Sequence, residues 1–320
     1  MSSLDEGQQA DGGRGSTRCA ERAPVGERGP LCYANGRLVP EAEACISVLD
    51  HAVLYGDGVF DTVVARHGRL FRLEDHIDRL FRSMAAISLS PPVSRAELRE
   101  LTARAVQANG LCEAYVKWVV TRGANGTPLM DPDGCKADFI ILVRPYTRRH
   151  GPNSRTGLRL KTTALRRPSG QVLSPQVKSL NYLNLVLAKI EAKAAEADEA
   201  LLLDLRGRVC EAPGSNVFVL LGGTLMTPAH DVLEGVTRAS VIDIAARDGV
   251  PVGICDIELY HAYVAEEVFL TSTAIGIVPV VEIDGRRIGE GRPGPVFKQI
   301  AQAYEEMIAS PDWGTPVDDG

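Results

Sequence analysis

Several features of membrane proteins and nucleic-acid-binding proteins are missing from this sequence of 320 residues. It has no apolar run of about eighteen residues, so we expect no membrane span. It has no basic stripe, and its net charge of −6 argues against nucleic acid as the main partner. The seven cysteines are scattered and form no C-x-x-C pair. We therefore expect reduced thiols, no metal site and a cytoplasmic location.

The remaining composition is that of a globular protein, because 45% of the residues are hydrophobic. Residues 1–30 differ from the rest. They are rich in Gly, Arg, Glu and Ser and contain no apolar stretch of signal-peptide length. We expect them to form a disordered extension. A transit peptide is the less favoured alternative, because acidic residues occur among them.

Hydrophobic periodicity and turn residues divide the rest of the chain into strands and helices. Asn35-Gly36 and the region of Gly68 predict hairpins, and Ser94 to Glu97 form a capping box that predicts the start of a helix. Apolar spacing predicts four more helices: Leu73–Met84, Leu180–Ala197, Thr237–Arg247 and Pro295–Ile308.

This order of elements predicts an α+β protein with two domains and a cleft between them. The polar stretch 148–157 is the expected linker. It separates a small N-terminal domain, 31–147, from a larger C-terminal domain, 158–310. We expect residues 311–320 to be a flexible tail.

Lys178 is the first candidate for chemistry, and only six other lysines compete with it. It lies just before a predicted helix and is followed by Ser179, Leu180 and Asn181. Most lysines are simply solvated. A lysine in a partly dry site, however, has a lowered pKa and can act as a nucleophile and proton shuttle. Such a lysine can hold the aldehyde of pyridoxal phosphate as a Schiff base.

Glu211 is the second candidate. It lies 33 residues after Lys178 and precedes the small residues Ala212 to Ser215. An isolated carboxylate in such a turn is usually exposed. Here the small neighbours would allow a flat ring to approach, and a carboxylate can keep a pyridine nitrogen protonated. Lys178 and Glu211 together therefore suit pyridoxal phosphate.

Three further segments suit an anion such as phosphate. Arg79 lies in an amphipathic helix, and its guanidinium offers a two-pronged fork. Gly235 to Arg238 open a helix, whose first amides and Thr237 hydroxyl would form an anion site. Thr271 to Ala274 follow a strand and would add hydroxyls and amides. Each of the three has an ordinary structural explanation when taken alone.

Six motifs of this chain occur in the order that is typical of class IV aminotransferases, the fold-type IV pyridoxal phosphate family. They are Tyr55–Phe60 (YGDGVF), His76–Leu80 (HIDRL), Lys178–Asn181 (KSLN), Glu211–Asn216 (EAPGSN), Gly235–Arg238 (GVTR) and Thr271–Ala274 (TSTA). The chain from about Cys32 to Ile308 resembles this family. The family includes branched-chain and D-amino acid aminotransferases, R-selective amine transaminases and aminodeoxychorismate lyase.

The resemblance implies a two-domain fold with pyridoxal 5′-phosphate in the interdomain cleft, a homodimer and a ping-pong reaction. It implies Lys178 as the Schiff-base lysine and Glu211 as the partner of the pyridine nitrogen, both catalytic. It also implies a set of cofactor-binding residues, namely Arg79, Lys178, Tyr182, Glu211, Leu233, Val236, Thr237, Ser272 and Thr273.

The motifs around Lys178 and Leu233 look like those of prokaryotic branched-chain aminotransferases, so we favour a branched-chain donor. Two positions depart from that group: Val64 stands where an arginine is usual, and Lys117 replaces the arginine of a Tyr-x-Arg motif. The expected substrate-binding residues are Tyr55, Phe60, Val64, Arg66, Tyr115, Lys117 and Ala274. The alternatives are a D-amino acid or R-amine donor, which the resemblance of Gly68–His76 to R-selective transaminases supports, and lyase activity on aminodeoxychorismate.

Overall fold

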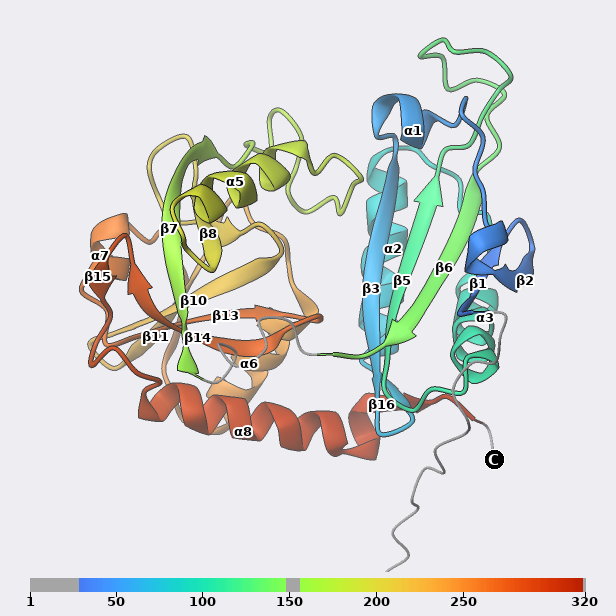
Figure 1. Cartoon of the computed structure of the whole chain (residues 1–320). Helices are drawn as coiled ribbons and strands as arrows, with labels where there is room; N and C mark the ends of the chain where they lie inside the picture. Colours follow the sequence, from blue (N-terminus) through green and yellow to red (C-terminus); the bar gives the residue numbers. More distant parts are fainter. Residues whose placement is uncertain (1–28, 148–155, 319–320) are drawn as a thin grey trace, which may run out of the picture.

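The computed structural model describes residues 29–147 and 156–318. The predicted extension at 1–30 and linker at 148–157 therefore lie almost wholly outside the described residues. Two sheets dominate the described chain, one from each half, and they stand side by side in Figure 1. No helix in the described ranges has the length and apolar character needed to cross a bilayer.

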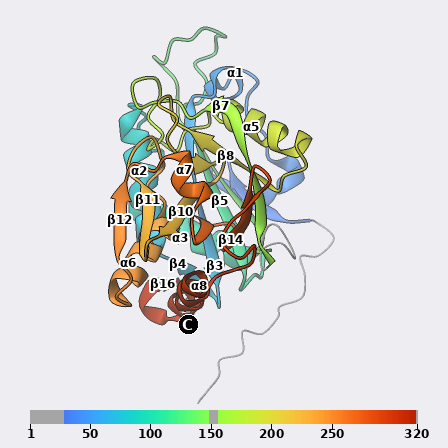
Figure 2. The same cartoon turned by 90° about the vertical axis from the view of Figure 1, so that its left-hand side faces the viewer.

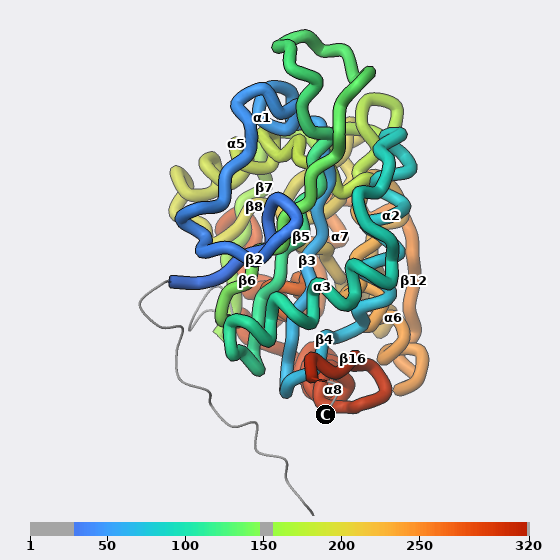
Figure 3. The backbone as a smooth tube through the Cα atoms, turned by 90° about the vertical axis from the view of Figure 1, so that its right-hand side faces the viewer, coloured from blue at the N-terminus to red at the C-terminus, as the bar shows by residue number. Residues whose placement is uncertain are grey.

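The first sheet has seven strands in the order β16-β4-β3-β5-β6-β1-β2. Its helices α2 and α3 run next to each other along it (Figure 3). The elements of this half are β1 Leu31–Ala34, β2 Arg37–Pro40, α1 His51–Tyr55, β3 Gly58–Arg66, β4 Arg69–Phe71, α2 Leu73–Ala86, α3 Arg95–Ala108, β5 Ala114–Thr121 and β6 Asp138–Pro145. The predicted hairpins, the helix from Leu73 and the capping box at Ser94 are confirmed.

The second sheet has nine strands, seven of them in the order β12-β11-β10-β13-β14-β7-β8, with β15 paired to β14 and β9 to β10. Its strands are β7 Leu158–Arg166, β8 Glu199–Leu203, β9 Glu211–Ala212, β10 Ser215–Leu221, β11 Thr224–Pro228, β12 Val252–Cys255, β13 Glu267–Ser272, β14 Gly276–Ile283 and β15 Arg286–Arg287. Its helices are α5 Leu183–Ala194, α6 Val236–Arg247, α7 Leu259–Tyr263 and α8 Pro295–Ala309. Figure 2 views the molecule from this half, with the second sheet in front of the first.

One apolar core joins the two halves. Val64 and Phe71 of the first sheet pack with Phe218 and Tyr304 of the second half, and the Phe71 and Tyr304 rings meet edge to face at 5.7 Å. Helix α8 carries Tyr304 and runs beneath both sheets (Figure 1). Burying large aromatic side chains across this boundary stabilises the arrangement of the halves. This shared core therefore fixes the relative position of the two halves and of the site between them.

The described residues after α8, 311–318, do not form the flexible tail that we expected for 311–320. Pro311–Trp313 form a short 3-10 helix, and strand β16, Gly314–Pro316, pairs antiparallel with β4. The backbone of the C-terminal segment thus completes the edge of the first sheet. Its polar composition concealed this pairing, because a short edge strand needs little apolar surface.

The predicted helix from Leu180 begins only at Leu183, because the preceding residues pair with β3. The backbone amide of Phe60 donates to the carbonyl of Lys178 at 2.9 Å, and that of Leu180 donates to Gly58 at 2.9 Å. This short pairing attaches the segment from Lys178 to Leu180 to the first sheet.

Among the cysteines in the described ranges, Cys32, Cys45, Cys135, Cys210 and Cys255 are free thiols, as expected.

Candidate active site

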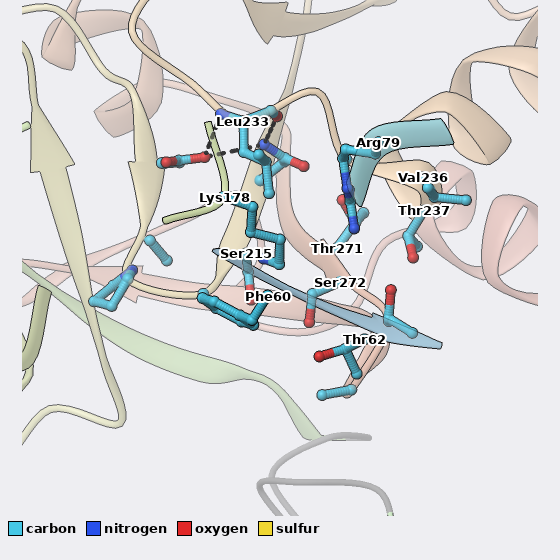
Figure 4. Close-up of a pocket in the computed structure, with 18 of the residues that line it drawn as sticks. Phe60, Thr62, Arg79, Lys178, Ser215, Leu233, Val236, Thr237, Thr271 and Ser272 are labelled. Atoms are coloured by element: carbon cyan, nitrogen blue, oxygen red, sulfur yellow. Dashed lines mark hydrogen bonds between the residues drawn. The ribbon is translucent and has the colours of Figure 1, made fainter. Parts of the chain in front are cut away.

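A cavity of about 330 Å³ lies between the two sheets and contains most of the predicted site residues. Its volume is in the range typical of small-molecule sites. In Figure 4, Lys178 lies next to Phe60, and Arg79, Thr271, Val236 and Thr237 gather on one side of it. The first sheet and α2 thus supply one wall, and the loops of the second half supply the other.

Lys178 is held at the centre by its backbone. Its carbonyl accepts from Phe60 of β3, and its amide donates to the Ser83 hydroxyl of α2 at 3.1 Å. Its ammonium lies 4.6 Å from the centre of the Phe60 ring. Burial first, and then the nearby Arg79 guanidinium, lower the pKa of Lys178 from 10.5 to about 8. About a tenth of this amine is therefore unprotonated at pH 7, far more than for an exposed lysine.

Glu211 lies on β9, directly opposite Asn216 of β10. The Asn216 side-chain amide donates to Glu211 Oε2 at 3.2 Å, and the Leu233 backbone amide donates to the same oxygen at 3.1 Å. Arg167 Nε lies 2.8 Å from Oε1 as an ion pair. Burial raises the pKa of Glu211 above its usual range, whereas Arg167 acts in the opposite direction. The two hydrogen bonds to Oε2 and the ion pair at Oε1 keep the carboxylate in one orientation.

Arg79 belongs to a buried charged cluster beneath the cavity. Its Nε and Nη2 donate to the two oxygens of Asp61 at 2.8 and 2.7 Å. Nη1 donates to the Glu234 carbonyl at 3.2 Å, and His76 Nδ1 lies 2.9 Å from Asp61 Oδ1. Burial opposes ionisation of Asp61, but Arg79 and His76 outweigh it and hold the pKa of the carboxyl well below its usual range. One edge of the guanidinium is thus fixed, and the residue still lines the cavity.

The start of α6 forms the opposite side of this anion-favouring region. Gly235 caps the helix, and a Cβ there would lie 2.1 Å from the Asn216 side-chain oxygen, so a larger residue would displace the Asn216 side chain. Val236 and Thr237 follow in the first turn and line the cavity, as do Ser272 and Thr273. The amides of a first helical turn favour an anion.

Thr271 supplies a direct test of whether a ligand fits here. Its hydroxyl is fully buried, lines the cavity and has no hydrogen-bond partner within the described part of the chain. An unsatisfied buried hydroxyl costs free energy unless a ligand accepts its hydrogen bond. Thr271, Arg79 and the start of α6 together fit a phosphate group.

Of the other predicted residues, Phe60, Tyr115, Lys117, Tyr182, Leu233 and Ala274 also line the cavity. The Tyr182 ring meets Phe60 edge to face at 5.1 Å. Burial, and then Glu211, raise the pKa of the Tyr182 hydroxyl, so it stays protonated and can donate a hydrogen bond. Lys117 belongs to the neighbouring strand β5, and its ammonium nitrogen lies 4.3 Å from the centre of the Phe60 ring.

Three predicted substrate residues are not among the residues that line this cavity, and their role in substrate binding stays a prediction. Tyr55 donates its hydroxyl hydrogen bond to the Pro128 carbonyl. Val64 is buried in the core that joins the two halves. Arg66 pairs with Glu113 and lies over the Tyr146 ring at 5.0 Å. Val64 and Arg66 share a face of β3 with Phe60, but they lie too far along the strand to reach the cavity.

Two lining residues, Thr62 and Arg167, lie outside the six motifs and were missed by sequence reasoning. Thr62 could have been found, because it is two residues after Phe60 and therefore on the same face of the strand. Its hydroxyl lies 3.5 Å from that of Tyr115. Arg167 had no local signal, since it meets Glu211 only through folding of the second half.

Comparison with known proteins agrees with this geometry. The sequence model of the family "Amino-transferase class IV" matches residues 58–283. A putative branched-chain-amino-acid aminotransferase of Methanocaldococcus jannaschii is 40% identical, over 90% of this chain and 99% of its own length. A D-alanine aminotransferase of Listeria monocytogenes is 36% identical, over 86% of this chain and 94% of its own.

The fold agrees as well. The crystal structure of the T.th. branched-chain amino acid aminotransferase complexed with N-(5′-phosphopyridoxyl)-L-glutamate superposes with a TM-score of 0.85. It is 35% identical, and the match covers 91% of this chain and 99% of that one. The expected fold-type IV architecture is therefore confirmed, and the chain belongs to the class IV aminotransferases, enzymes of the transaminase class.

Proposed function

We propose that this chain transfers an amino group from a branched-chain amino acid to a 2-keto acid, with pyridoxal 5′-phosphate as cofactor and a ping-pong course. One observation carries the proposal: a buried lysine and a buried, oriented carboxylate face one cavity that also has an anion-favouring side. Transamination with this cofactor needs these three groups.

The residues divide the work of holding the cofactor. Arg79, the first turn of α6, Thr271, Ser272 and Thr273 would hold its phosphate. The cofactor, when bound, supplies an aldehyde for amines and a ring that accepts electrons. Glu211 would hold the proton on the ring nitrogen, and Arg167 favours the ionised form of that carboxylate. Leu233 would pack against the ring, and Tyr182 would donate to its hydroxyl.

Lys178 has two roles in this proposal. Its amine binds the cofactor aldehyde in the resting enzyme. Once a substrate amine has displaced it, Nζ of Lys178 would take a proton from the substrate Cα. It would return that proton to the cofactor carbon that carried the aldehyde. Because its pKa is about 8, the free amine can serve as a base near neutral pH. Phe60 and Leu180 line the cavity around it and limit the access of water.

The substrate side suits an apolar side chain next to a carboxylate. Phe60, Thr62 and Tyr115 offer largely apolar surface, and Lys117 offers a cation. The branched-chain enzymes among the relatives support this donor class. A D-amino acid donor is the second candidate, supported by the D-alanine aminotransferase relative.

We further propose that two copies associate through α5. Leu183, Val186, Leu187 and Ile190 lie on one face of this helix, and 43 to 71% of each residue is exposed. A second copy would cover this apolar stripe, because exposed patches of this kind mark interaction sites.

A cytoplasmic location remains a prediction from the sequence.

A donor screen tests the proposal. The purified chain is supplied with pyridoxal phosphate and 2-oxoglutarate, and then with L-leucine, D-alanine or an R-amine such as (R)-1-phenylethylamine. We expect L-leucine to give the highest kcat/KM. Faster reaction with D-alanine would favour the second candidate. Release of pyruvate and 4-aminobenzoate from aminodeoxychorismate without a keto acid would overturn transamination.

A further inference from the structure

Two lysine side chains share the ring of Phe60. The ammonium nitrogen of Lys178 lies 4.6 Å from the ring centre, and that of Lys117 lies 4.3 Å from it. The ring can attract both cations, but the cations repel each other. Because both are measured from the same centre, at most about 8.9 Å separates the two nitrogens.

The two lysines have different surroundings. Charged or titratable side chains from several elements act on Lys178: Asp61 of β3, Arg79 and His76 of α2, Lys117 of β5 and Glu211 of β9. Tyr182, next to α5, lines the same cavity. Lys117 is partly buried, and burial lowers its pKa. Within the described ranges, no acidic side chain pairs with it.

We propose that Lys117 acts on the chemistry through Lys178, across the Phe60 ring. In the empty pocket its charge favours the unprotonated amine of Lys178. A substrate carboxylate that binds Lys117 neutralises this charge and therefore favours the protonated form of Lys178. The inference rests on the proposed aminotransferase function, and it adds a coupling between substrate recognition and the base.

The coupling has the direction that the reaction needs. An unprotonated amine is required to bind the cofactor aldehyde, and the repulsion from Lys117 favours that form. When a donor carboxylate neutralises Lys117, the displaced Lys178 becomes a stronger base. Lys178 would then take the Cα proton at Nζ, and the ring of the bound cofactor would supply the acceptor for the electron pair of the broken Cα–H bond. A donor without a carboxylate lacks this second effect.

The size of the effect follows from Coulomb's law. Two unit charges about 9 Å apart at an effective dielectric constant of about 20 correspond to a shift on the order of one pH unit. Screening by water in an open pocket would reduce the shift, and a shorter separation would increase it. A shift of this size is measurable by titration.

The test compares Lys117→Met, which removes the charge, with Lys117→Arg, which keeps it. For each full-length protein loaded with pyridoxal phosphate, the pH midpoint of the visible absorbance band is measured with and without 4-methylpentanoate, a branched carboxylate without an amine. We expect the Met variant to raise the midpoint by about one pH unit and the Arg variant to leave it near that of the wild type. The carboxylate should raise the midpoint in the wild type and the Arg variant only.

An unchanged midpoint in Lys117→Met, or an equal carboxylate response in that variant, would overturn the inference while leaving the aminotransferase proposal intact. Absence of any visible band in the wild type would overturn both. The cofactor-free proteins give an independent readout. The pH dependence of acetylation at Lys178, followed by mass spectrometry, should shift upward in Lys117→Met and not in Lys117→Arg, and no shift in Lys117→Met would contradict the proposal.

Discussion

The buried pair of Asp61 and Arg79 gives a sharp prediction about stability. Asp61→Asn keeps the size of the side chain and removes its charge. In the native chain this fully buried carboxylate accepts two hydrogen bonds from Arg79 and one from the Thr62 amide, and it contacts His76. The substitution would leave the Arg79 guanidinium buried without its counter-ion.

Breaking a buried pair at one partner typically costs about 3–5 kcal/mol. The amide oxygen of asparagine still accepts from Arg79, so we expect the lower end, about 3 kcal/mol. The exposed pair of Asp78 and Arg95 is the matched control. There, Asp78→Asn should change the free energy of unfolding by less than about 1 kcal/mol.

Urea unfolding of both cofactor-free variants measures this difference. The contribution of Asp61 should be complete above the usual carboxyl pKa and lost as the pH falls through its lowered folded-state pKa. The wild type should therefore lose this contribution in acid, and Asp61→Asn should not. Equal stability of the two variants at neutral pH would refute the reasoning.

Three further predictions concern the site and the surface. Glu211→Gln should still bind cofactor but slow each half-reaction by about 100-fold or more, because an amide cannot hold the ring nitrogen charged. Stopped-flow absorbance measures the half-reactions, and unchanged rates would remove Glu211 from this role. Acetylation of Lys178 in the cofactor-free chain should have a pH midpoint of about 8, because burial lowers its pKa, and a midpoint like that of exposed lysines would contradict a dry site. Replacing Leu187 and Ile190 by Lys should yield monomers in analytical ultracentrifugation, whereas Leu205→Lys, at a position exposed outside α5, should not; a dimer that persists in the double variant would exclude this face.

Local sequence signals predicted much of the fold. The Asn35-Gly36 turn, the capping box at Ser94 and the apolar spacing of α2 each depend on residues close in sequence, and each appears in the structure. Strand β16 was missed because its stability comes from pairing with β4, which is about 240 residues away in the chain. Pairings of this kind leave no local pattern.

The site shows the same division. Lys178, Glu211 and Arg79 stood out through their motifs, and the structure places all three in one cavity. Val64 and Arg66 were expected there from their position after the glycine-rich turn. The length of β3 carries them past the cavity, into the joint core and to Glu113. A motif fixes the start of a strand but not which of its later residues reach a cavity.

The identity of the cofactor-binding lysine is the central claim, and one measurement tests it directly. The purified protein is mixed with pyridoxal phosphate, reduced with borohydride, digested and mapped by mass spectrometry. The account predicts a phosphopyridoxyl group on the peptide that contains Lys178 and on no peptide that contains Lys117, Lys136, Lys161, Lys189, Lys193 or Lys298 alone. A stoichiometric adduct on one of those six lysines, with Lys178 unmodified, would contradict the account.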